Sequence, residues 1–231
     1  MDILLDLQEY KFRSNDIKNI CSWIKSMPNK KNIKNIFTYS NECYEFELNI
    51  IDYFNNCSHF QILKPNIKQY EKCIDKIYGN FKFKISNELI EDFSPEPNIS
   101  YDLIILYHIL DNENYDKIIN KCKKMLNNNS KIIIITYNLN SIMSLKNKYH
   151  ETYTMLKSYD IKSKFNNSKF KIFQTQISCN MNLKGISKEL IKNLIEKKLN
   201  DNDFEKIIDY LKKKYRFNLK QKIDIYMINN K

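Results

Sequence analysis

The three histidines are the side chains best suited to acid–base chemistry near neutral pH. His108 follows directly after the apolar run Asp102–Tyr107, which predicts a buried strand. From the end of that strand, His108 could act as a general base or orient an acceptor amine. The alternative is a histidine that only makes hydrogen bonds within a loop. His59 opens another predicted strand and His150 lies on a polar helix, so we expect both to be structural or solvated.

Other polar side chains stand near the same predicted strand ends. Asp102 begins its strand, a position where an aspartate more often fixes a loop than takes part in chemistry. Tyr107, Tyr137 and Asn138 lie near the carboxyl ends of two central strands and could line a pocket. The chain has 16 tyrosines, however, so packing is the default role for each of them.

Metal and disulfide chemistry have little support in the sequence. The six cysteines form no CxxC pair and no Cys/His cluster, whereas structural zinc sites normally bring their ligands in closely spaced pairs. We therefore expect no metal site, and reduced, mostly buried thiols. The cysteines are Cys21, Cys43, Cys57, Cys73, Cys122 and Cys179.

Glycine is almost absent from the 231 residues: Gly79 and Gly185 are the only two. This count excludes a Walker A loop, a GxGxxG turn and a glycine-rich linker. Isoleucine, lysine, asparagine, tyrosine and phenylalanine dominate instead, and all have A/T-rich codons. The composition is therefore explained first by an A/T-rich genome, and only then by the physical demands of the fold.

The formal net charge is +11, which favours an anionic partner. The same codon bias inflates lysine, so most lysine groups are expected to be solvated helix faces. The best basic patch is Lys212, Lys213 and Lys214 with Arg216, which could bind RNA. The acidic start of the chain and the lack of a long apolar run predict a soluble, intracellular and cytoplasmic protein.

Hydrophobic periodicity predicts a helical cap over residues 1–33 and an α/β domain over residues 34–231. Within the domain, strands alternate with amphipathic helices, which indicates a seven-stranded, mostly parallel sheet with helices on both faces. The last two strands suggest an antiparallel final pair. Asn127–Ser130 is expected to form a turn. The predicted strands are residues 35–39, 59–63, 81–85, 102–107, 131–137, 169–179 and 222–227.

This order of elements resembles the class I S-adenosylmethionine (SAM) methyltransferase fold. The most telling part is Tyr101–Leu110, followed by a helix and the apolar run Lys131–Asn138. Within that superfamily, Ile62–Ile77, Tyr137–Glu151 and Phe170–Leu183 most resemble the histamine N-methyltransferase group. The resemblance covers roughly residues 34–228 and implies SAM as cofactor and a small nitrogen or oxygen acceptor.

The resemblance also locates a cofactor site at the carboxyl ends of the strands. The family's glycine-rich turn corresponds to Tyr39–Leu48, and its glycine positions fall among Ser40, Asn41, Glu42 and Tyr44. None of these is glycine, so the motif is degenerate. The side chains of Glu42 and Tyr44 would add bulk where the cofactor approaches the backbone.

A second anchor in the family is an acid at the end of the second strand, which accepts hydrogen bonds from the ribose. Lys64 occupies that place, and an ammonium has no acceptor. Glu42, Glu45 or Glu47 could substitute for the acid. Asn87 falls near the expected adenine. By position, the cofactor contacts would come from Ser40, Asn41, Glu42, Lys64, Asn87 and Tyr107, with His108 as the catalytic residue.

Three functions are compatible with this pattern. The first is SAM-dependent methyl transfer to a small acceptor through a remodelled cofactor loop. The second is a catalytically inactive methyltransferase-like protein that serves as a partner or regulatory subunit of another protein. The third is an RNA-binding accessory protein that uses the lysine excess on the same scaffold.

Overall fold

The computed structural model describes residues 16–40, 45–54, 56–77, 83–107, 115–137, 158–165, 169–182, 201–215 and 218–230. The strands are β1 (Asn35–Ser40), β2 (His59–Leu63), β3 (Phe83–Ser86), β4 (Tyr101–Tyr107), β5 (Leu126–Tyr137), β6 (Phe170–Asn182) and β7 (Asn218–Asn230). The helices are one over residues 16–25, η1 (Lys30–Asn32), α2 (Glu45–Ile51), α3 (Ile67–Ile77), α4 (Tyr115–Met125), α6 (Ser158–Lys164) and α8 (Asp201–Tyr215).

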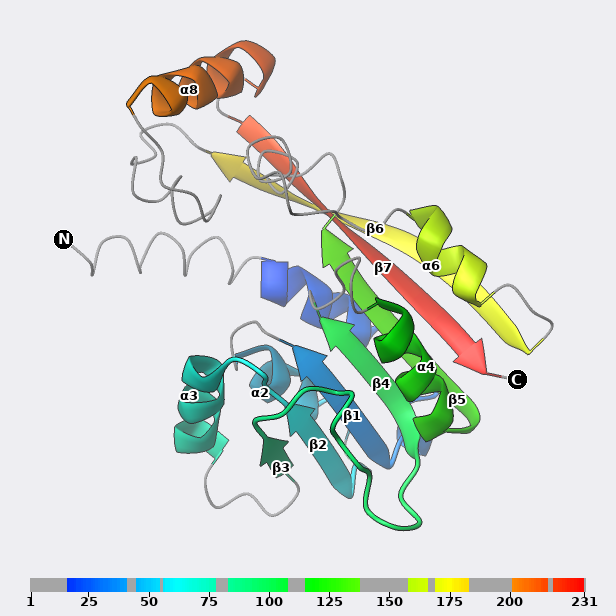
Figure 1. Ribbon diagram of the computed structural model, residues 1–231. Coiled ribbons are helices and arrows are strands. Elements are labelled where there is room, and N and C mark those ends of the chain that lie inside the picture. The colour runs from blue at the N-terminus through cyan, green and yellow to red at the C-terminus, as the bar shows by residue number, and fades with distance from the viewer. Residues whose placement is uncertain are drawn as a thin grey trace. The chain divides into compact units, whose positions relative to one another are not determined.

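The seven strands form one sheet in the order β3-β2-β1-β4-β5-β7-β6. The neighbours from β3 to β5 pair in parallel, with Thr38 of β1 opposite Ile62 of β2 and Ile105 of β4. β7 runs against β5 and β6 (Figure 1). The predicted mostly parallel sheet with an antiparallel final strand is therefore confirmed.

The turn predicted at Asn127–Ser130 is wrong, because these residues belong to β5. The prediction relied on the turn preference of asparagine. Here the segment is tied to its neighbours through side chain and backbone: Asn127 Nδ2 donates to the Ser100 carbonyl at 3.2 Å, and the Asn127 backbone carbonyl accepts from Asn230 Nδ2 at 2.8 Å. A local break remains, since Asn129 has a φ of 61° and the β4–β5 register shifts nearby.

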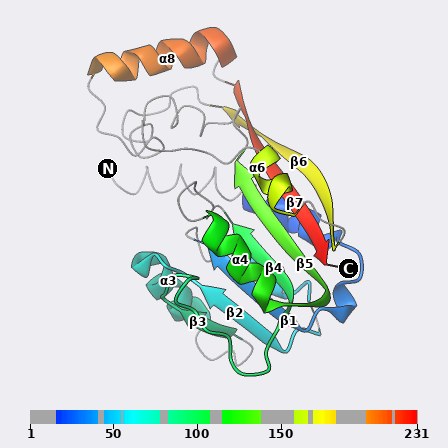
Figure 2. The same ribbon diagram turned by 45° about the vertical axis from the view of Figure 1, so that its right-hand side comes forward.

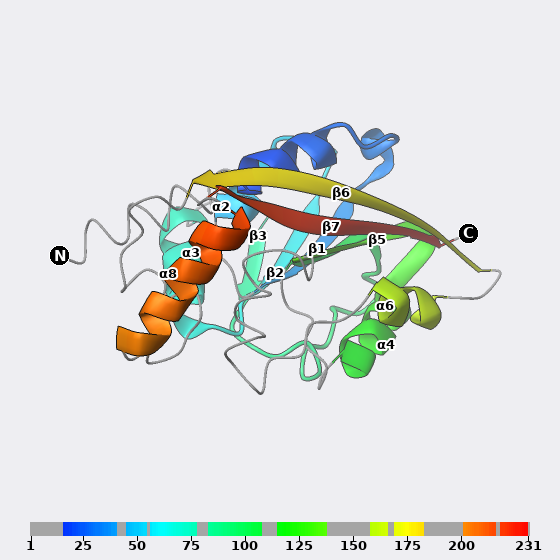
Figure 3. The same ribbon diagram turned by 90° about the horizontal axis from the view of Figure 1, so that it is seen from above.

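Helices cover both faces of the central strands. On one face, α4 lies over β4 and β5 and α6 lies beside α4, around a core that includes Ile104, Ile134 and Ile161 (Figure 2). On the other face lie α2 and the helical residues 21–25 (Figure 3). Runs such as Leu103–Leu106 are fully buried because helices cover both faces, which explains their nearly continuous apolar sequence.

The chain divides into two compact units. One unit comprises Cys21–Thr136, Leu156–Thr175 and Ile225–Lys231, and holds β1 to β5 with α2, α3, α4 and α6. The other comprises Met1–Ile20, Tyr137–Met155 and Gln176–Asp224, and holds α8. In this second unit Gln176 Nε2 donates to the buried Asp224 carboxylate at 2.8 Å. The candidate site lies in the first unit.

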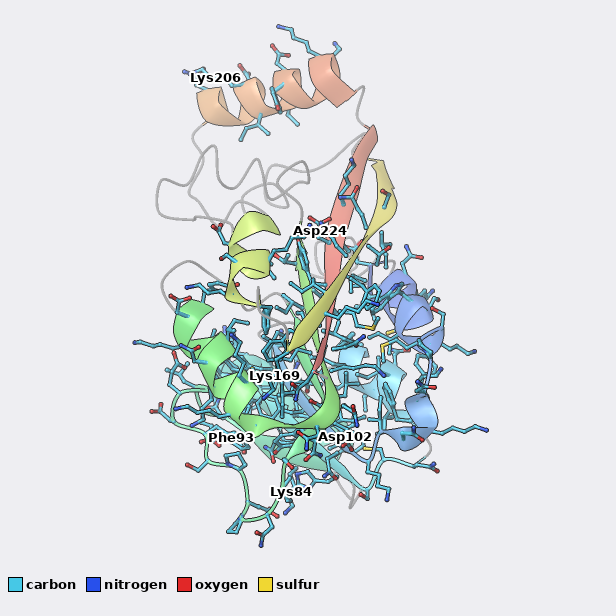
Figure 4. The ribbon with its side chains drawn as sticks, turned by 90° about the vertical axis from the view of Figure 1, so that its right-hand side faces the viewer. Lys84, Phe93, Asp102, Lys169, Lys206 and Asp224 are labelled. Carbon is cyan, nitrogen blue, oxygen red and sulfur yellow. The ribbon has the colours of Figure 1, made fainter. Side chains whose placement is uncertain are left out.

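Asp102 connects three strands at their amino ends (Figure 4). Its Oδ2 accepts hydrogen bonds from the backbone N–H groups of Lys34 and Asn35 at 2.8 and 2.9 Å. Its Oδ1 accepts from Asn127 Nδ2 at 2.8 Å. These bonds hold the starts of β1 and β5 to β4, so Asp102 fixes loops, as the sequence predicts.

Asparagine fills the left-handed positions among the described residues: Asn29, Asn98 and Asn129 have φ values of 62°, 67° and 61°. Asparagine tolerates this region better than other non-glycine residues. We therefore expect Asn98→Ala to lower the free energy of unfolding by about 1 kcal/mol, whereas Asn98→Gly changes it little. Urea unfolding of the two variants measures both, and equal destabilisation would contradict the conformational explanation.

Among the cysteines whose side chains the structure describes, Cys21, Cys57, Cys73 and Cys122 are buried, free thiols. This confirms the expected state for those four. In the part of the chain that the structure describes, none of the helices combines the length and the apolar character needed to cross a membrane.

Candidate site at the carboxyl ends of β1 and β2

The candidate site lies where the strand order reverses. β1 has β2 on one side and β4 on the other, so the connections leaving β1 and β4 run to opposite sides of the sheet. Open α/β sheets bind ligands in the crevice outside the carboxyl ends of strands at such a point. Ser40 ends β1, Lys64 follows β2 and Tyr107 ends β4. The residues at these three positions therefore decide what the site can bind.

Three polar side chains form a buried cluster here. Lys64 Nζ lies 2.8 Å from Glu47 Oε1, and both side chains are 0% exposed. Ser40 Oγ donates to the same carboxylate oxygen at 3.0 Å and accepts a hydrogen bond from Lys64 Nζ. The other oxygen, Glu47 Oε2, is buried without a hydrogen-bond partner among the described residues. Glu47 thus depends on Lys64 and Ser40 for its solvation.

The field of Glu47 reaches two buried thiols. Burial, with the Glu47 carboxylate as the second cause, raises the pKa of Cys21 to about 12. Burial first and Glu47 second also raise the pKa of Cys73 to about 12, while Lys64 opposes the shift. A thiol with such a pKa stays protonated at neutral pH and is a poor nucleophile. Neither cysteine is therefore a candidate for covalent chemistry.

The other described candidates at this edge are held in packing and backbone contacts. The Asn87 side chain donates to the carbonyls of Lys64 and Pro65 at 2.6 and 3.1 Å, which ties the loop after β3 to the end of β2. The Tyr107 ring is buried and stacks on Phe46 of α2, with ring centroids 4.6 Å apart. Both residues therefore stabilise this edge of the sheet.

The structure thus brings Ser40, Lys64, Asn87 and Tyr107 to one edge of the sheet, and their roles toward a ligand stay predictions. Asn41, Glu42 and His108 lie outside the described residues, as does Asn138. In the RNA patch, Lys212 and Lys213 are exposed on α8, and Lys213 Nζ lies 3.9 Å from an Asp209 oxygen. Arg216 lies outside the described residues, and the Lys214 side chain is not described.

These residues do not fit the ribose of SAM in the way the resemblance implies. The ribose hydroxyls need an acceptor at the end of β2, but Lys64 supplies only donors there. The nearest acid, Glu47, is already engaged by Lys64 and Ser40 away from solvent. Ser40, one of the residues among which the resemblance places the family's glycines, has its hydroxyl inside the same cluster.

Glu47 is the residue whose position the sequence left open. It was one of three glutamates that could substitute for the missing acid, with Glu42 and Glu45. The structure instead pairs it with Lys64, the lysine at that position. A signal exists in the spacing: Phe46, Glu47 and Ile50 share the buried face of α2, so Glu47 falls among apolar residues. A buried glutamate needs a cationic partner, and Lys64 is that partner.

Comparisons with known proteins agree with the fold. No family model matches the sequence, and no characterised protein sequence matches it. The YcgJ protein from Bacillus subtilis superposes with a TM-score of 0.69 at 9% identity, covering 91% of this chain and 97% of its own. The plantazolicin methyltransferase BpumL, solved with SAH, gives 0.60 at 15% identity, covering 96% and 88%.

A third similar structure is the N-methyltransferase NodS from Bradyrhizobium japonicum, with a TM-score of 0.59 at 8% identity. It covers 96% of this chain and 98% of its own. Identities this low define the fold alone. The chain therefore has the Rossmann-like fold of class I methyltransferases, as its sequence predicts.

Proposed function

We propose that this chain is a methyltransferase-fold protein that does not bind SAM in the family's manner and serves as a non-catalytic partner or regulatory subunit. The observation that supports this proposal is the buried cluster of Lys64, Glu47 and Ser40. In this cluster Lys64, which the resemblance aligns with the family's ribose-binding acid, is a cation paired with Glu47. The chemistry of the cluster is structural, because each charged group neutralises the other.

Opening this cluster for a ligand would be costly. To turn Glu47 toward a ribose, the protein would have to remove Lys64 from its carboxylate in a dry environment. An uncompensated buried charge costs several kcal/mol, which exceeds the gain from an ordinary pair of hydrogen bonds to a sugar. SAM binding by this route is therefore disfavoured energetically as well as geometrically.

The competing function is methyl transfer to a small nitrogen or oxygen acceptor through a remodelled loop. In that case Glu47 would be the substitute ribose acceptor, and its removal would abolish SAM binding. Glu45 provides a matched control, because it is a half-buried glutamate two residues away on the same helix. The two functions thus differ in a measurable way.

We expect calorimetry of the wild-type protein with SAM and with SAH to show no saturable heat at about 1 mM ligand. Thermal unfolding should be unchanged as well, although a ligand at 100 times its Kd would add about 2.7 kcal/mol of stability. Micromolar binding would overturn the proposal. If that binding were lost in Glu47→Gln and kept in Glu45→Gln, both variants being folded by circular dichroism, Glu47 would be a ribose ligand.

A further inference from the structure

A lysine-rich, aromatic surface lies on the first unit, at the edge of the sheet. β6 is the last strand in the sheet order, and its first residues carry exposed lysines (Figure 4, where Lys169 is labelled). We define the β6 edge cluster as Lys123, Lys169, Phe170, Lys171 and Phe173. Lys123 lies in the last turn of α4, Lys169 directly precedes β6, and the other three residues belong to the start of β6.

Each aromatic ring of this cluster has an ammonium beside it. Lys171 Nζ lies 5.0 Å from the centroid of the Phe173 ring, and Phe173 is 43% exposed. The half-buried Phe170 ring has Lys123 Nζ at 5.6 Å and Lys169 Nζ at 6.0 Å. Lys171 and Phe173 are two positions apart in β6, so they share its exposed face, whereas Phe170 lies on the other face and packs against the core. The rim therefore offers flat apolar surface and positive charge side by side.

The positive charge of the β6 edge cluster is not neutralised by acidic residues close to it in the sequence. The chain has 27 acidic residues, yet none occurs between Asp160 and Glu189. Codon bias does not explain this gap, since glutamate and aspartate also have A/T-rich codons. Two acids lie nearby: Asp160 is in the first turn of α6, and Asp116 of α4 pairs with Lys164 at 2.7 Å. Further exposed lysines, Lys124 and Lys162, flank the cluster.

The charge state of Lys123 is consistent with a positive local field. Burial lowers its pKa, and the nearby Lys164 ammonium lowers it further, while Asp116 opposes the shift. Its Nζ also donates to the Lys164 carbonyl at 2.6 Å, which fixes the ammonium above the Phe165 and Phe170 rings. A bound anion would relieve the repulsion between the two lysines.

We propose that the β6 edge cluster binds single-stranded nucleic acid, with the lysines contacting phosphates and Phe173 stacking on a base. Proteins that bind single strands without sequence preference combine a basic track with aromatic side chains in this way. An acidic protein would need the charge but not the exposed ring, and a membrane surface would need more apolar area than the single exposed Phe173. The inference goes beyond the proposed function and can fail separately, because it does not depend on SAM.

The test is fluorescence anisotropy of the full-length protein with a labelled oligouridylate of about 12 nucleotides. We expect saturable binding that weakens with salt, with a slope of log K against log salt of about −2 to −3, as for three or four phosphate contacts. Lys169→Glu/Lys171→Glu should weaken binding at least about tenfold and flatten this slope. Phe173→Ala should weaken binding about 5- to 100-fold and leave the slope unchanged.

The matched control is Lys212→Glu/Lys213→Glu on α8, which makes the same charge change elsewhere. We expect the control to retain wild-type affinity. An equal loss in both pairs would overturn the proposal and indicate non-specific attraction or the α8 patch. An unchanged affinity in Phe173→Ala, or heparin binding as tight as RNA binding, would also overturn it. So would Lys169- and Lys171-dependent binding to phosphatidylserine vesicles in the absence of RNA binding.

Discussion

Replacing Lys64 with methionine is expected to lower the free energy of unfolding by about 3–5 kcal/mol. The substitution leaves the Glu47 carboxylate in a fully buried place with one hydrogen bond, from Ser40 Oγ. Burying an unpaired charge is far more expensive than losing an exposed ion pair. Urea unfolding followed by circular dichroism, with both proteins at the same neutral pH, measures the change.

The control removes the whole cluster rather than one partner. Replacing a buried ionic triad with apolar residues of similar size is often neutral or stabilising. The triple variant Ser40→Ala/Glu47→Leu/Lys64→Met should therefore be much more stable than Lys64→Met and close to the wild-type protein. Equal destabilisation in the two variants would show that Lys64 contributes through packing of its side chain rather than through its charge.

The fold could be predicted from the sequence because its signals are local. Leu103–Leu106 and Ile132–Ile135 are runs of apolar residues between amphipathic helices, and this pattern identifies buried parallel strands. The residues at which individual strands and helices begin and end were harder to predict. β5 begins at Leu126 rather than after the asparagine-rich segment, because side-chain bonds from Ser100, Asp102 and Asn230 hold that segment in the sheet.

The places of the candidate residues in the fold could be predicted from the sequence, but their contacts could not. The sequence located Ser40 and Lys64 at the ends of β1 and β2, and the structure agrees. Their pairing through Glu47 depends on how α2 is rotated against the sheet, which three-dimensional packing decides. Glu45 and Glu47 stand two positions apart on a short helix, and only Glu47 turns to the buried face.

The scarcity of glycine has two different consequences in this chain. At Asn29, Asn98 and Asn129 asparagine takes the left-handed conformation that glycine usually supplies, so turns survive the composition. Ser40, in the turn that the resemblance aligns with the family's glycines, makes a side-chain contact instead: its hydroxyl joins the buried Lys64–Glu47 pair. The asparagines thus satisfy a backbone requirement, whereas the Ser40 side chain contributes to a buried ionic cluster.

The second large effect is expected for Asp102→Ala, at about 3 kcal/mol of destabilisation. The carboxylate accepts two backbone N–H groups, of Lys34 and Asn35, and one side-chain amide, of Asn127. Hydrogen bonds to a charged acceptor contribute about 1.5–3 kcal/mol each, but Asp102 is half-buried, so the three do not add in full. Its loss should loosen the amino ends of β1, β4 and β5 together.

Asp102→Asn separates two contributions of this residue to stability, the hydrogen bonds that it accepts and its negative charge. An amide has one oxygen, so it can accept from the backbone of residues 34 and 35 or from Asn127, while its NH₂ faces the remaining donor. We expect about half the loss seen with alanine. The surface control Asp75→Ala, on the exposed side of α3, should change stability by less than about 0.5 kcal/mol. If Asp102→Ala matched that control, the hydrogen bonds at the strand ends would not hold the sheet together.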